Sequence, residues 1–123
     1  MIALRVTTDF KIEKIELKEP SRESLRKALG GYPELVRPRR LARPYCMLVD
    51  DKGLLKDLQL NSVGSYLYET DKHNQPIVGD IFIMREANSI DGSILVGLQE
   101  SDIDSLMVQV SRIVRVFDDS YKE

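Results

Sequence analysis

A long apolar stripe close to the C-terminal end constrains the fold of this chain more than any other feature. Its members recur at spacings of three and four, the period of one helix face: Ile103, Leu106, Met107, Val110, Ile113, Val114 and Phe117. Ser101 is predicted to cap this helix, with Asp104 in a capping-box-like relation to it. Such a stripe can also form a seam with a partner helix. Because strand-forming segments occur in the same chain, we expect it to pack on an intramolecular sheet.

The segment of residues 44–68 is expected to form the centre of that sheet. Residues 45–49 are apolar and rich in strand-forming residues, and turn residues follow them directly, among them Gly53. This order predicts a strand, a tight turn and a short second strand, with Gly53 supplying a positive φ to the hairpin. Asn61 is then predicted to cap a short helix that carries Tyr66.

Two strands are predicted at the N-terminal end. Residues 1–7 alternate between apolar and polar side chains, as a half-buried strand does. A turn follows, and residues 10–17 resume the alternation, which slips at Lys14. A bulge is therefore expected near Glu13 and Lys14, and the two strands are expected to pair as a hairpin.

A helix is predicted after this hairpin, with Ser21 as its N-cap and Gly30 and Gly31 at its end. A phosphate-binding loop needs its glycines before a helix, where free backbone N–H groups point outward, but here they follow one. We therefore interpret the glycine pair as a helix C-cap with a left-handed residue.

Further strands are expected at residues 34–37, 77–84 and 94–98, with a polar loop at residues 69–76 and a loop through Asn88, Asp91 and Gly92 before the last strand. The first of them is expected to pair with the strand that begins at Tyr45, through the loop of residues 38–43. The second of these strands is nearly all apolar, which predicts an interior strand covered on both faces. Residues 1–123 are thus predicted to form a single α+β domain, a mixed or mainly antiparallel sheet of about six strands with two or three helices packed on it.

The length and composition fit one globular domain. The chain has 123 residues, of which 42% are hydrophobic and 31% charged. Its apolar runs are far too short for a membrane span and its N-terminus lacks a signal-peptide pattern, so a cytoplasmic location is expected. Cys46 is the one cysteine and is predicted to be a small buried hydrophobe; His73 is the one histidine. We therefore expect no disulfide, no metal site and no cofactor.

The charge is distributed unevenly. Residues 21–43 hold seven Lys and Arg against two Asp and Glu, a net charge of +5, whereas residues 44–123 hold seven against fourteen, a net charge of −7. Four of the basic residues fall within one short loop: Arg37, Arg39, Arg40 and Arg43. Arginine forks match phosphate and carboxylate oxygens, so this loop is a candidate contact for a nucleic acid or an acidic partner. The alternative is a solvated loop, and no aromatic residue is interleaved to stack on single-stranded bases.

Three residues are pocket candidates: Asn61, Tyr66 and Asp80. Asp80 interrupts an apolar strand, so it is either a functional acid with a raised pKa or a structural residue, which sits at a strand end or answers a backbone donor near Gly79. No histidine, lysine or second acid is placed by sequence to form a catalytic pair with it, which favours the structural alternative. Common hydrolase, nucleotide-binding and redox motifs do not occur. Three further tyrosines either line a pocket or form the rim of the core: Tyr32, Tyr45 and Tyr68.

Several segments together resemble one family. They are LRKALGGYPEL at residues 25–35, LVDDKGLLKDLQLN at residues 48–61, IVGDIFI at residues 77–83, and Leu98 with the acidic start of the last helix. This order resembles the domain-of-unknown-function family numbered thirty-eight forty-six, found in phages, plasmids and bacteria. The most specific pieces are Gly30, Gly31 and Tyr32 with the Gly53 turn and the pair Leu60 and Asn61. The resemblance implies an α+β domain and a mobile-element setting, and it implies no activity.

The leading hypothesis is a non-enzymatic accessory protein that binds a protein or a nucleic acid through the four arginines. The alternative is a small hydrolase or transferase with a site at Asp80 and Asn61, near Tyr66. A third hypothesis is a homodimer joined by edge strands. No membrane partner is expected.

Overall fold

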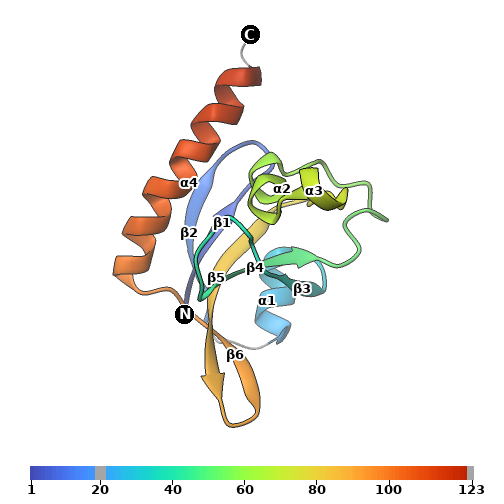
Figure 1. The fold of residues 1–123 in the computed structure, drawn as a ribbon. Coiled ribbons are helices and arrows are strands. Elements are labelled where there is room, and N and C mark those ends of the chain that lie inside the picture. The colour runs from blue at the N-terminus through green and yellow to red at the C-terminus, as the bar shows by residue number, and fades with distance from the viewer. Residues whose placement is uncertain (19–21, 122–123) are drawn as a thin grey trace.

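The computed structural model describes residues 1–18 and 22–121, which form one sheet with helices on both of its faces (Figure 1). The predicted cap Ser21 lies outside the described residues. The strands and helices, in chain order, are β1 (Ile2–Val6), β2 (Ile12–Glu16), α1 (Arg22–Leu29), β3 (Pro33–Val36), β4 (Tyr45–Asp50), α2 (Ser62–Tyr68), α3 (Thr70–His73), β5 (Ile81–Ser89), β6 (Gly92–Val96) and α4 (Glu100–Tyr121).

The sheet is antiparallel at every pair of neighbouring strands, in the order β2-β1-β5-β4-β3. β5 is its central strand, because Ile83 pairs with Leu4 of β1 on one side and with Met47 of β4 on the other. The second half of β5 pairs with β6. This arrangement confirms the predicted α+β domain with a mainly antiparallel sheet.

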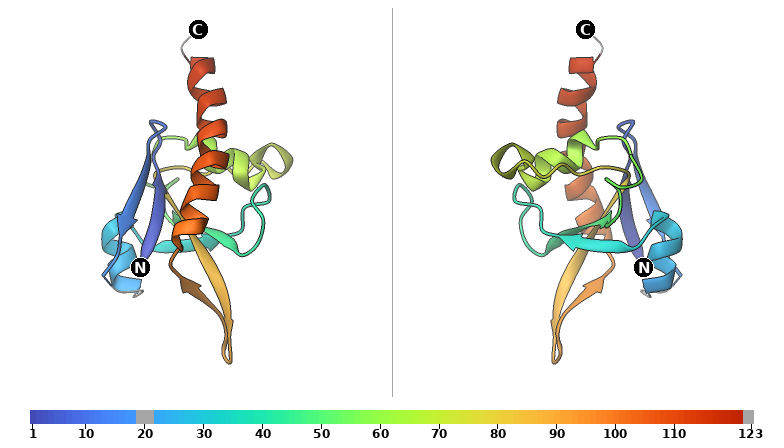
Figure 2. Two further views of the ribbon diagram at one scale, coloured as in Figure 1. Left: turned by 90° about the vertical axis from the view of Figure 1, so that its left-hand side faces the viewer. Right: turned by 90° about the vertical axis from the view of Figure 1, so that its right-hand side faces the viewer.

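Both faces of the sheet are covered because its central strands are apolar on both sides. In β5, Ile81 and Ile83 belong to the core under α2 and α4, whereas Phe82 and Met84 belong to the core under α1. All four side chains are fully buried, which confirms the predicted interior strand. Figure 2 shows α1 and α2 on opposite sides of the molecule.

The helix α4 packs on the sheet through most of the predicted stripe. Ile103, Leu106 and Val110 are buried, and the other stripe residues of the following two turns are partly buried against the same core: Ile113, Val114 and Phe117. Met107 is the exception, with 37% of its surface exposed. It lies about 100° around the helix from Leu106, at the margin of the buried face.

The start of α4 differs from the prediction. The helix begins at Glu100, which places the expected cap, Ser101, inside the first turn. The carboxylate that accepts a hydrogen bond here belongs to Asp102, whose Oδ2 lies 2.8 Å from the backbone nitrogen of Gln99. Because Oδ1 of Asp102 also accepts a hydrogen bond of 2.8 Å from the Tyr45 hydroxyl, this residue joins the helix to β4.

The bulge predicted near Glu13 and Lys14 is wrong, because β1 and β2 pair without interruption along the whole of β2. The alternation slips because both faces of β2 are used. Ile12 packs against the core under α4, and Ile15 packs against the core under α1. A strand buried in part on both faces need not keep one apolar side.

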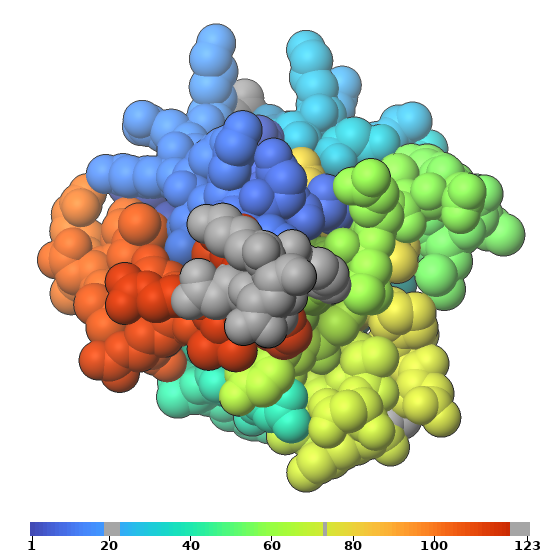
Figure 3. Space-filling model, turned by 90° about the horizontal axis from the view of Figure 1, so that it is seen from above, coloured from blue at the N-terminus to red at the C-terminus, as the bar shows by residue number. Residues whose placement is uncertain are grey.

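The turn between β1 and β2 holds an aromatic residue in the left-handed region, Phe10, with φ 69°. The backbone N–H of Thr7 donates to the Lys11 carbonyl at 2.9 Å, and that of Phe10 donates to the Thr7 carbonyl at 3.2 Å. This is the bonding of a three-residue hairpin loop whose last position commonly holds glycine. In Figure 3 the turn lies between the end of α4 and the segment around α2.

The hairpin predicted after β4 is also wrong. β4 pairs with β3 and β5, and the residues after it form turns. In place of a second strand, a single bridge joins Leu60 to Val78. Gly53 does not have a positive φ; a Cβ atom there would lie 2.7 Å from Cγ2 of Val78, so glycine allows this turn to pack closely.

The C-terminal half of β5 forms a ribbon with β6 that projects from the rest of the molecule (Figures 1 and 2). β5 begins at Ile81, later than predicted, and continues to Ser89 through the expected loop. At the tip, Ile90 is fully exposed. The polar loop predicted at residues 69–76 contains the helical turn α3. None of the helices in the described ranges is long and apolar enough to cross a membrane.

Candidate functional site

The predicted arginine cluster lies on the connection from β3 to β4, residues 37–44, which we call the arginine loop. The backbone N–H groups of Arg39 and Arg40 both donate to the carbonyl of Leu67, at 2.8 and 3.1 Å. Leu67 is fully buried in α2. The loop is therefore fastened to the helix beside it and holds its side chains on a fixed backbone.

Arg40 is engaged in holding α2 and α3. Its Nη1 donates to the Tyr66 carbonyl at 2.8 Å, and its Nη2 lies 3.4 Å from a carboxylate oxygen of Asp71. The guanidinium carbon lies 4.2 Å from the centre of the Tyr66 ring, and Nε lies 3.9 Å from Glu69. With these contacts, the arginine acts mainly as a brace between the loop and the two helices.

Arg37 makes a two-pronged ion pair with Glu86 of β5. Its Nε and Nη2 lie 3.1 and 2.9 Å from the two carboxylate oxygens. These hydrogen bonds and the charge of Glu86 raise the pKa of Arg37. The side chain of Arg37 is 60% exposed, so its outer edge still faces solvent.

The remaining two arginines are exposed, and within the described ranges neither the Arg39 nor the Arg43 side chain has a hydrogen bond or ion pair. Together with Arg37 they line a surface cavity of about 630 Å³. Tyr45 and Tyr68 line the same cavity. The fold thus brings three of the four predicted arginines together and adds tyrosines that the loop sequence itself lacks.

The pocket candidate Asn61 has a structural position. Its side chain is fully buried and its Oδ1 accepts a hydrogen bond of 2.9 Å from the backbone N–H of Gly64, which confirms it as the cap of α2. Its Nδ2 donates to the carbonyls of Val6 and Gly79 at 3.0 and 2.9 Å. The amide nitrogen and the amide oxygen of Asn61 are thus both bonded to the backbone, which leaves neither group available to bind a ligand.

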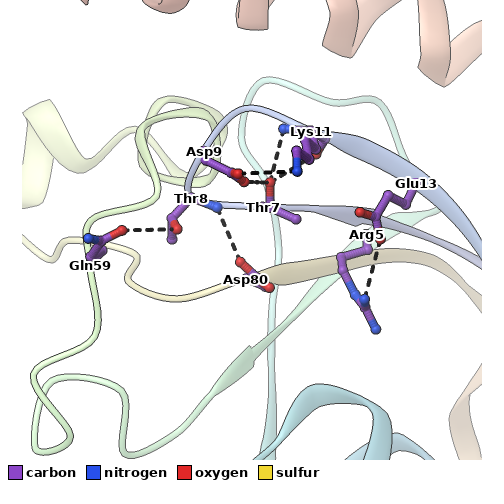
Figure 4. A network of polar contacts seen from close by, with 8 residues as sticks. All are labelled: Arg5, Thr7, Thr8, Asp9, Lys11, Glu13, Gln59 and Asp80. Carbon is purple, nitrogen blue, oxygen red and sulfur yellow. Dashed lines mark hydrogen bonds and ion pairs between the residues drawn. The ribbon is translucent and has the colours of Figure 1, made fainter.

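Asp80 lies at the start of β5 and is exposed (Figure 4). Its Oδ1 accepts a hydrogen bond of 3.1 Å from the backbone N–H of Thr8, in the β1–β2 turn. The hydroxyl of Thr8 lies 3.3 Å from Oε1 of Gln59, so this turn is held from two further segments of the chain. Asp80 therefore has a structural role at the end of a strand, which is the alternative that the sequence favoured over a functional acid.

Tyr66 lines a separate cavity of about 390 Å³ with Arg40 and Phe117, to which neither Asn61 nor Asp80 contributes. The structure therefore does not gather the three pocket candidates around one cavity. Asn61 and Asp80 are linked only through the backbone, because the Asn61 amide donates to the carbonyl of Gly79, the residue before Asp80.

The glycine pair after α1 has two different roles. Gly30 has φ +84° and its N–H donates to the Arg26 carbonyl at 2.9 Å, which confirms the predicted C-cap. Gly31 instead allows a close approach, because a Cβ atom there would lie 2.2 Å from Oδ2 of Asp50. That carboxylate is almost fully buried and lies 2.6 Å from Nζ of Lys56.

Cys46 is fully buried, and burial, together with the charge of Glu86, raises the pKa of its thiol to about 12. A thiol with this pKa carries almost no thiolate at neutral pH and is a packing residue. Within the described ranges, His, Cys, Asp and Glu do not form a group of three or more that could hold a metal ion. The side chain of His73 is not among those described.

The fold defines a small α+β domain built on a mainly antiparallel sheet, with an arginine-lined cavity beside the edge strand β3. The chain belongs to the family described as Domain of unknown function (DUF3846), whose match covers residues 1–111. This match confirms the resemblance carried by the glycine pair and the segments that follow it. No curated protein and no solved structure matches the chain.

Proposed function

We propose that this protein is a non-enzymatic binding module that holds an extended acidic segment of a partner protein at the arginine loop. The observation that carries the proposal is the pair of exposed side chains of Arg39 and Arg43 beside a cavity, on a loop that is fixed to α2. Because the loop backbone is already fixed, binding of a carboxylate orders only the two arginine side chains, which lowers its entropic cost.

The neighbouring edge of the sheet supports an extended ligand. β3 is the last strand of the sheet, and it pairs only with β4 within the described ranges. The N–H of Asp51 donates to the Tyr32 carbonyl, so the alternation of an antiparallel ladder turns the backbone groups of Leu35 toward the open edge. Glu34, Leu35 and Val36 of this strand line the arginine cavity. A peptide could add to this edge as a strand and reach Arg39 and Arg43 with its side chains.

The charge of the chain favours a protein over a nucleic acid. Affinity for nucleic acid comes from the sum of many phosphate contacts, whereas the arginine loop offers few unpaired cations. The whole chain carries a net charge of −2, and residues 44–123 alone carry a net charge of −7. An acidic surface of this kind repels a long polyanion but tolerates a short acidic peptide.

The enzymatic alternative has less support. Asn61 is fully buried with its amide engaged by the backbone, and Asp80 serves the β1–β2 turn. We place the partner in the cytosol, and the family resemblance adds a mobile-element setting to this proposal.

The test is the fluorescence anisotropy of a labelled peptide in which glutamate alternates with threonine, at low and at physiological salt. The wild type is expected to bind this peptide, and the double variant Arg39→Ala/Arg43→Ala to bind it at least about tenfold more weakly, because two charge-assisted hydrogen bonds are lost. The double variant Arg112→Ala/Arg115→Ala is the matched control, since it removes the same charge from exposed positions on α4.

A second peptide, with proline at alternate positions, tests strand addition, because proline removes the N–H groups that would pair with β3. It is expected to lose binding. Equal loss in both double variants, or no binding of the acidic peptide at low salt, contradicts the proposal. Binding of labelled single-stranded RNA or duplex DNA that depends on Arg39 and Arg43 supports a nucleic-acid partner in its place.

A further inference from the structure

A further cavity, of about 490 Å³, opens near the start of β3, between the end of α1 and the turn after β4. Its lining comes from two segments of the chain that are distant in sequence: Glu23, Arg26, Lys27, Gly30, Gly31 and Tyr32 from the first, and Asp50, Asp51, Lys52 and Lys56 from the second. Apart from Glu23, these residues lie within the motifs that carry the family resemblance. The cavity shares none of the arginines of the arginine loop.

The floor of this cavity is a neutral, rigid unit. Asp50 is 9% exposed and its Oδ1 accepts a hydrogen bond of 2.9 Å from the backbone N–H of Lys52, while its Oδ2 lies 2.6 Å from Nζ of Lys56. The same Nζ donates to the Gly30 carbonyl at 3.2 Å. The charge of Lys56 is thus matched by Asp50, and the pair joins the end of α1 to the β4 turn.

One wall of the cavity carries a positioned guanidinium group. The Cζ atom of Arg26 lies over the ring of Tyr32, 4.1 Å from its centre. A guanidinium group that rests its face on an aromatic ring keeps its N–H donors, which lie in its plane, free for an anion. Tyr32 is itself 47% exposed, so this stacked pair forms part of the open rim.

Two lysines add to this group from the two sides of the cavity. The side chains of Lys27 and Lys52 are exposed, and within the described ranges neither has a hydrogen bond or ion pair. With Arg26 they give three cations, against the two carboxylates Glu23 and Asp51, so the lining beyond the neutral floor carries a net charge of +1.

We infer that this cavity binds a small molecule through a phosphate group, with Arg26, Lys27 and Lys52 as the contacts. A phosphate monoester carries close to two negative charges at neutral pH and offers three strong acceptor oxygens, which suits three cations that line one cavity better than a single carboxylate does. The glycines contribute no phosphate cradle. Their role is to admit Asp50 and to end α1, which positions the cations.

The test is isothermal titration calorimetry with inorganic phosphate, AMP and citrate, each at constant ionic strength. Binding of phosphate and AMP is expected for the wild type, and binding of AMP alone would identify an ester as the ligand class. The double variant Lys27→Gln/Lys52→Gln is expected to weaken binding at least about tenfold. The matched control Lys11→Gln/Lys14→Gln removes the same charge from β2 and its turn and is expected to bind as the wild type does.

Amide NMR shifts on addition of phosphate provide a second readout that needs no variant, and they are expected to concentrate at Lys27, Gly31 and Lys52. Absence of binding by phosphate and AMP, binding of citrate alone, or equal weakening in both lysine variants overturns the inference. The Arg39→Ala/Arg43→Ala variant is expected to bind phosphate normally. Failure of the peptide assay therefore does not imply failure here.

Discussion

Phe10 shows how a single residue can hold a turn against its own backbone preference. An aromatic residue in the left-handed region has a strained backbone, yet the ring packs against the core under α4. The packing of the ring therefore offsets the strain at the tip of the β1–β2 hairpin. A sequence reader assigns Phe10 to a strand, because its apolar side chain gives no sign of the turn.

We predict that glycine is less destabilising than alanine at position 10, the reverse of the usual order for these two substitutions. Phe10→Ala and Phe10→Gly both remove the ring, but glycine adopts a left-handed conformation without the strain of about 1 kcal/mol that alanine retains. The glycine variant is therefore expected to be the more stable in urea unfolding. The same pair of substitutions at Ile12, inside β2, is the control and is expected to give the usual order, with alanine more stable. A more stable Phe10→Ala variant contradicts the strained turn.

Gly31 gives a prediction from close approach. In Gly31→Ala the new Cβ meets Oδ2 of Asp50, which Lys56 and the N–H of Lys52 hold in place, so we expect a loss of about 2 kcal/mol in the free energy of unfolding. In an Asp50→Ala background the obstructing atoms are gone, and the same substitution is expected to cost much less. Chemical denaturation of the four proteins measures this coupling. Equal costs in the two backgrounds would show that the contact does not limit residue 31.

At the scale of elements, the start of α4 is tied to the sheet by one carboxylate. Burial disfavours the charge of Asp102, but the hydrogen bonds from the Gln99 N–H and the Tyr45 hydroxyl, with the charge of Arg85 at 3.4 Å, outweigh burial and lower the pKa of Asp102. Burial and the hydrogen bond to Asp102 raise the pKa of the Tyr45 hydroxyl. The helix is thus anchored to β4 and β5 at its first turn.

This anchor predicts a stability difference that depends on pH. A lowered pKa in the folded state means that the stabilisation is present above the unfolded value of 3.8 and is lost as the pH falls through the folded value. Asp102→Asn is expected to cost about 1 kcal/mol at neutral pH, the usual scale for a lost cap, and progressively less under acid conditions.

Urea unfolding of the wild type and of Asp102→Asn over this pH range measures the difference. Asp104→Asn, on the exposed side of the same helix, is the control and is expected to behave as the wild type at every pH. A penalty for Asp102→Asn that stays constant into acid would contradict the role of the charge.

Most elements could be predicted because their signals are local. The period of the α4 stripe, the apolar run in β5 and the cap of α2 at Asn61 all lie within one stretch of chain. The failures come from distant contacts. The pairing of β3 with β4 was predicted because a short loop joins the two strands, and it is confirmed. Nothing near β4 indicates that its other neighbour is β5 rather than the chain that follows it, and the core under α1 makes β2 appear irregular.

The same limit applies to the candidate sites. The arginine loop was recognisable because its four arginines are close in sequence, but their pairing was not. Arg37 and Arg40 meet acids from β5 and α3, and Tyr45 and Tyr68 reach the cavity from other elements. The cavity at the end of α1 carried less signal still, because Lys27 and Lys52 come from segments that are distant in sequence and meet only through the β3–β4 pairing and the contacts of Asp50 and Lys56.

At the scale of the whole molecule, Asn61 connects three parts of the fold. Its amide donates to the carbonyl of Val6 at the end of β1 and to that of Gly79 before β5, and its oxygen caps α2. Because the Asn61 side chain is fully buried, water does not reach these backbone groups to take over its hydrogen bonds. It therefore fixes α2 over the end of the sheet.

We predict that Asn61→Ala is among the most destabilising substitutions in the chain, with a loss of about 3 kcal/mol or more, because it removes three buried hydrogen bonds, those to the Val6 and Gly79 carbonyls and that from the Gly64 N–H. Asn61→Asp keeps the acceptor for the Gly64 N–H but cannot donate when ionised, so a large loss is expected there too. Asn88→Ala, on the exposed ribbon, is the control and is expected to change stability little. The midpoints of urea unfolding provide the comparison, and a mild effect of Asn61→Ala would contradict the role of the network.

The central position of β5 has a consequence for the order in which the protein is made. β1 leaves the ribosome first, yet its inner neighbour is β5, whose Ile83 pairs with Leu4 only after most of the chain has been synthesised. Before then, the growing chain can complete only the β1–β2 and β3–β4 hairpins. In each hairpin the edge that later pairs with β5 has no partner strand. The nascent polypeptide therefore carries two hairpins whose inner edges stay unpaired until β5 emerges between them.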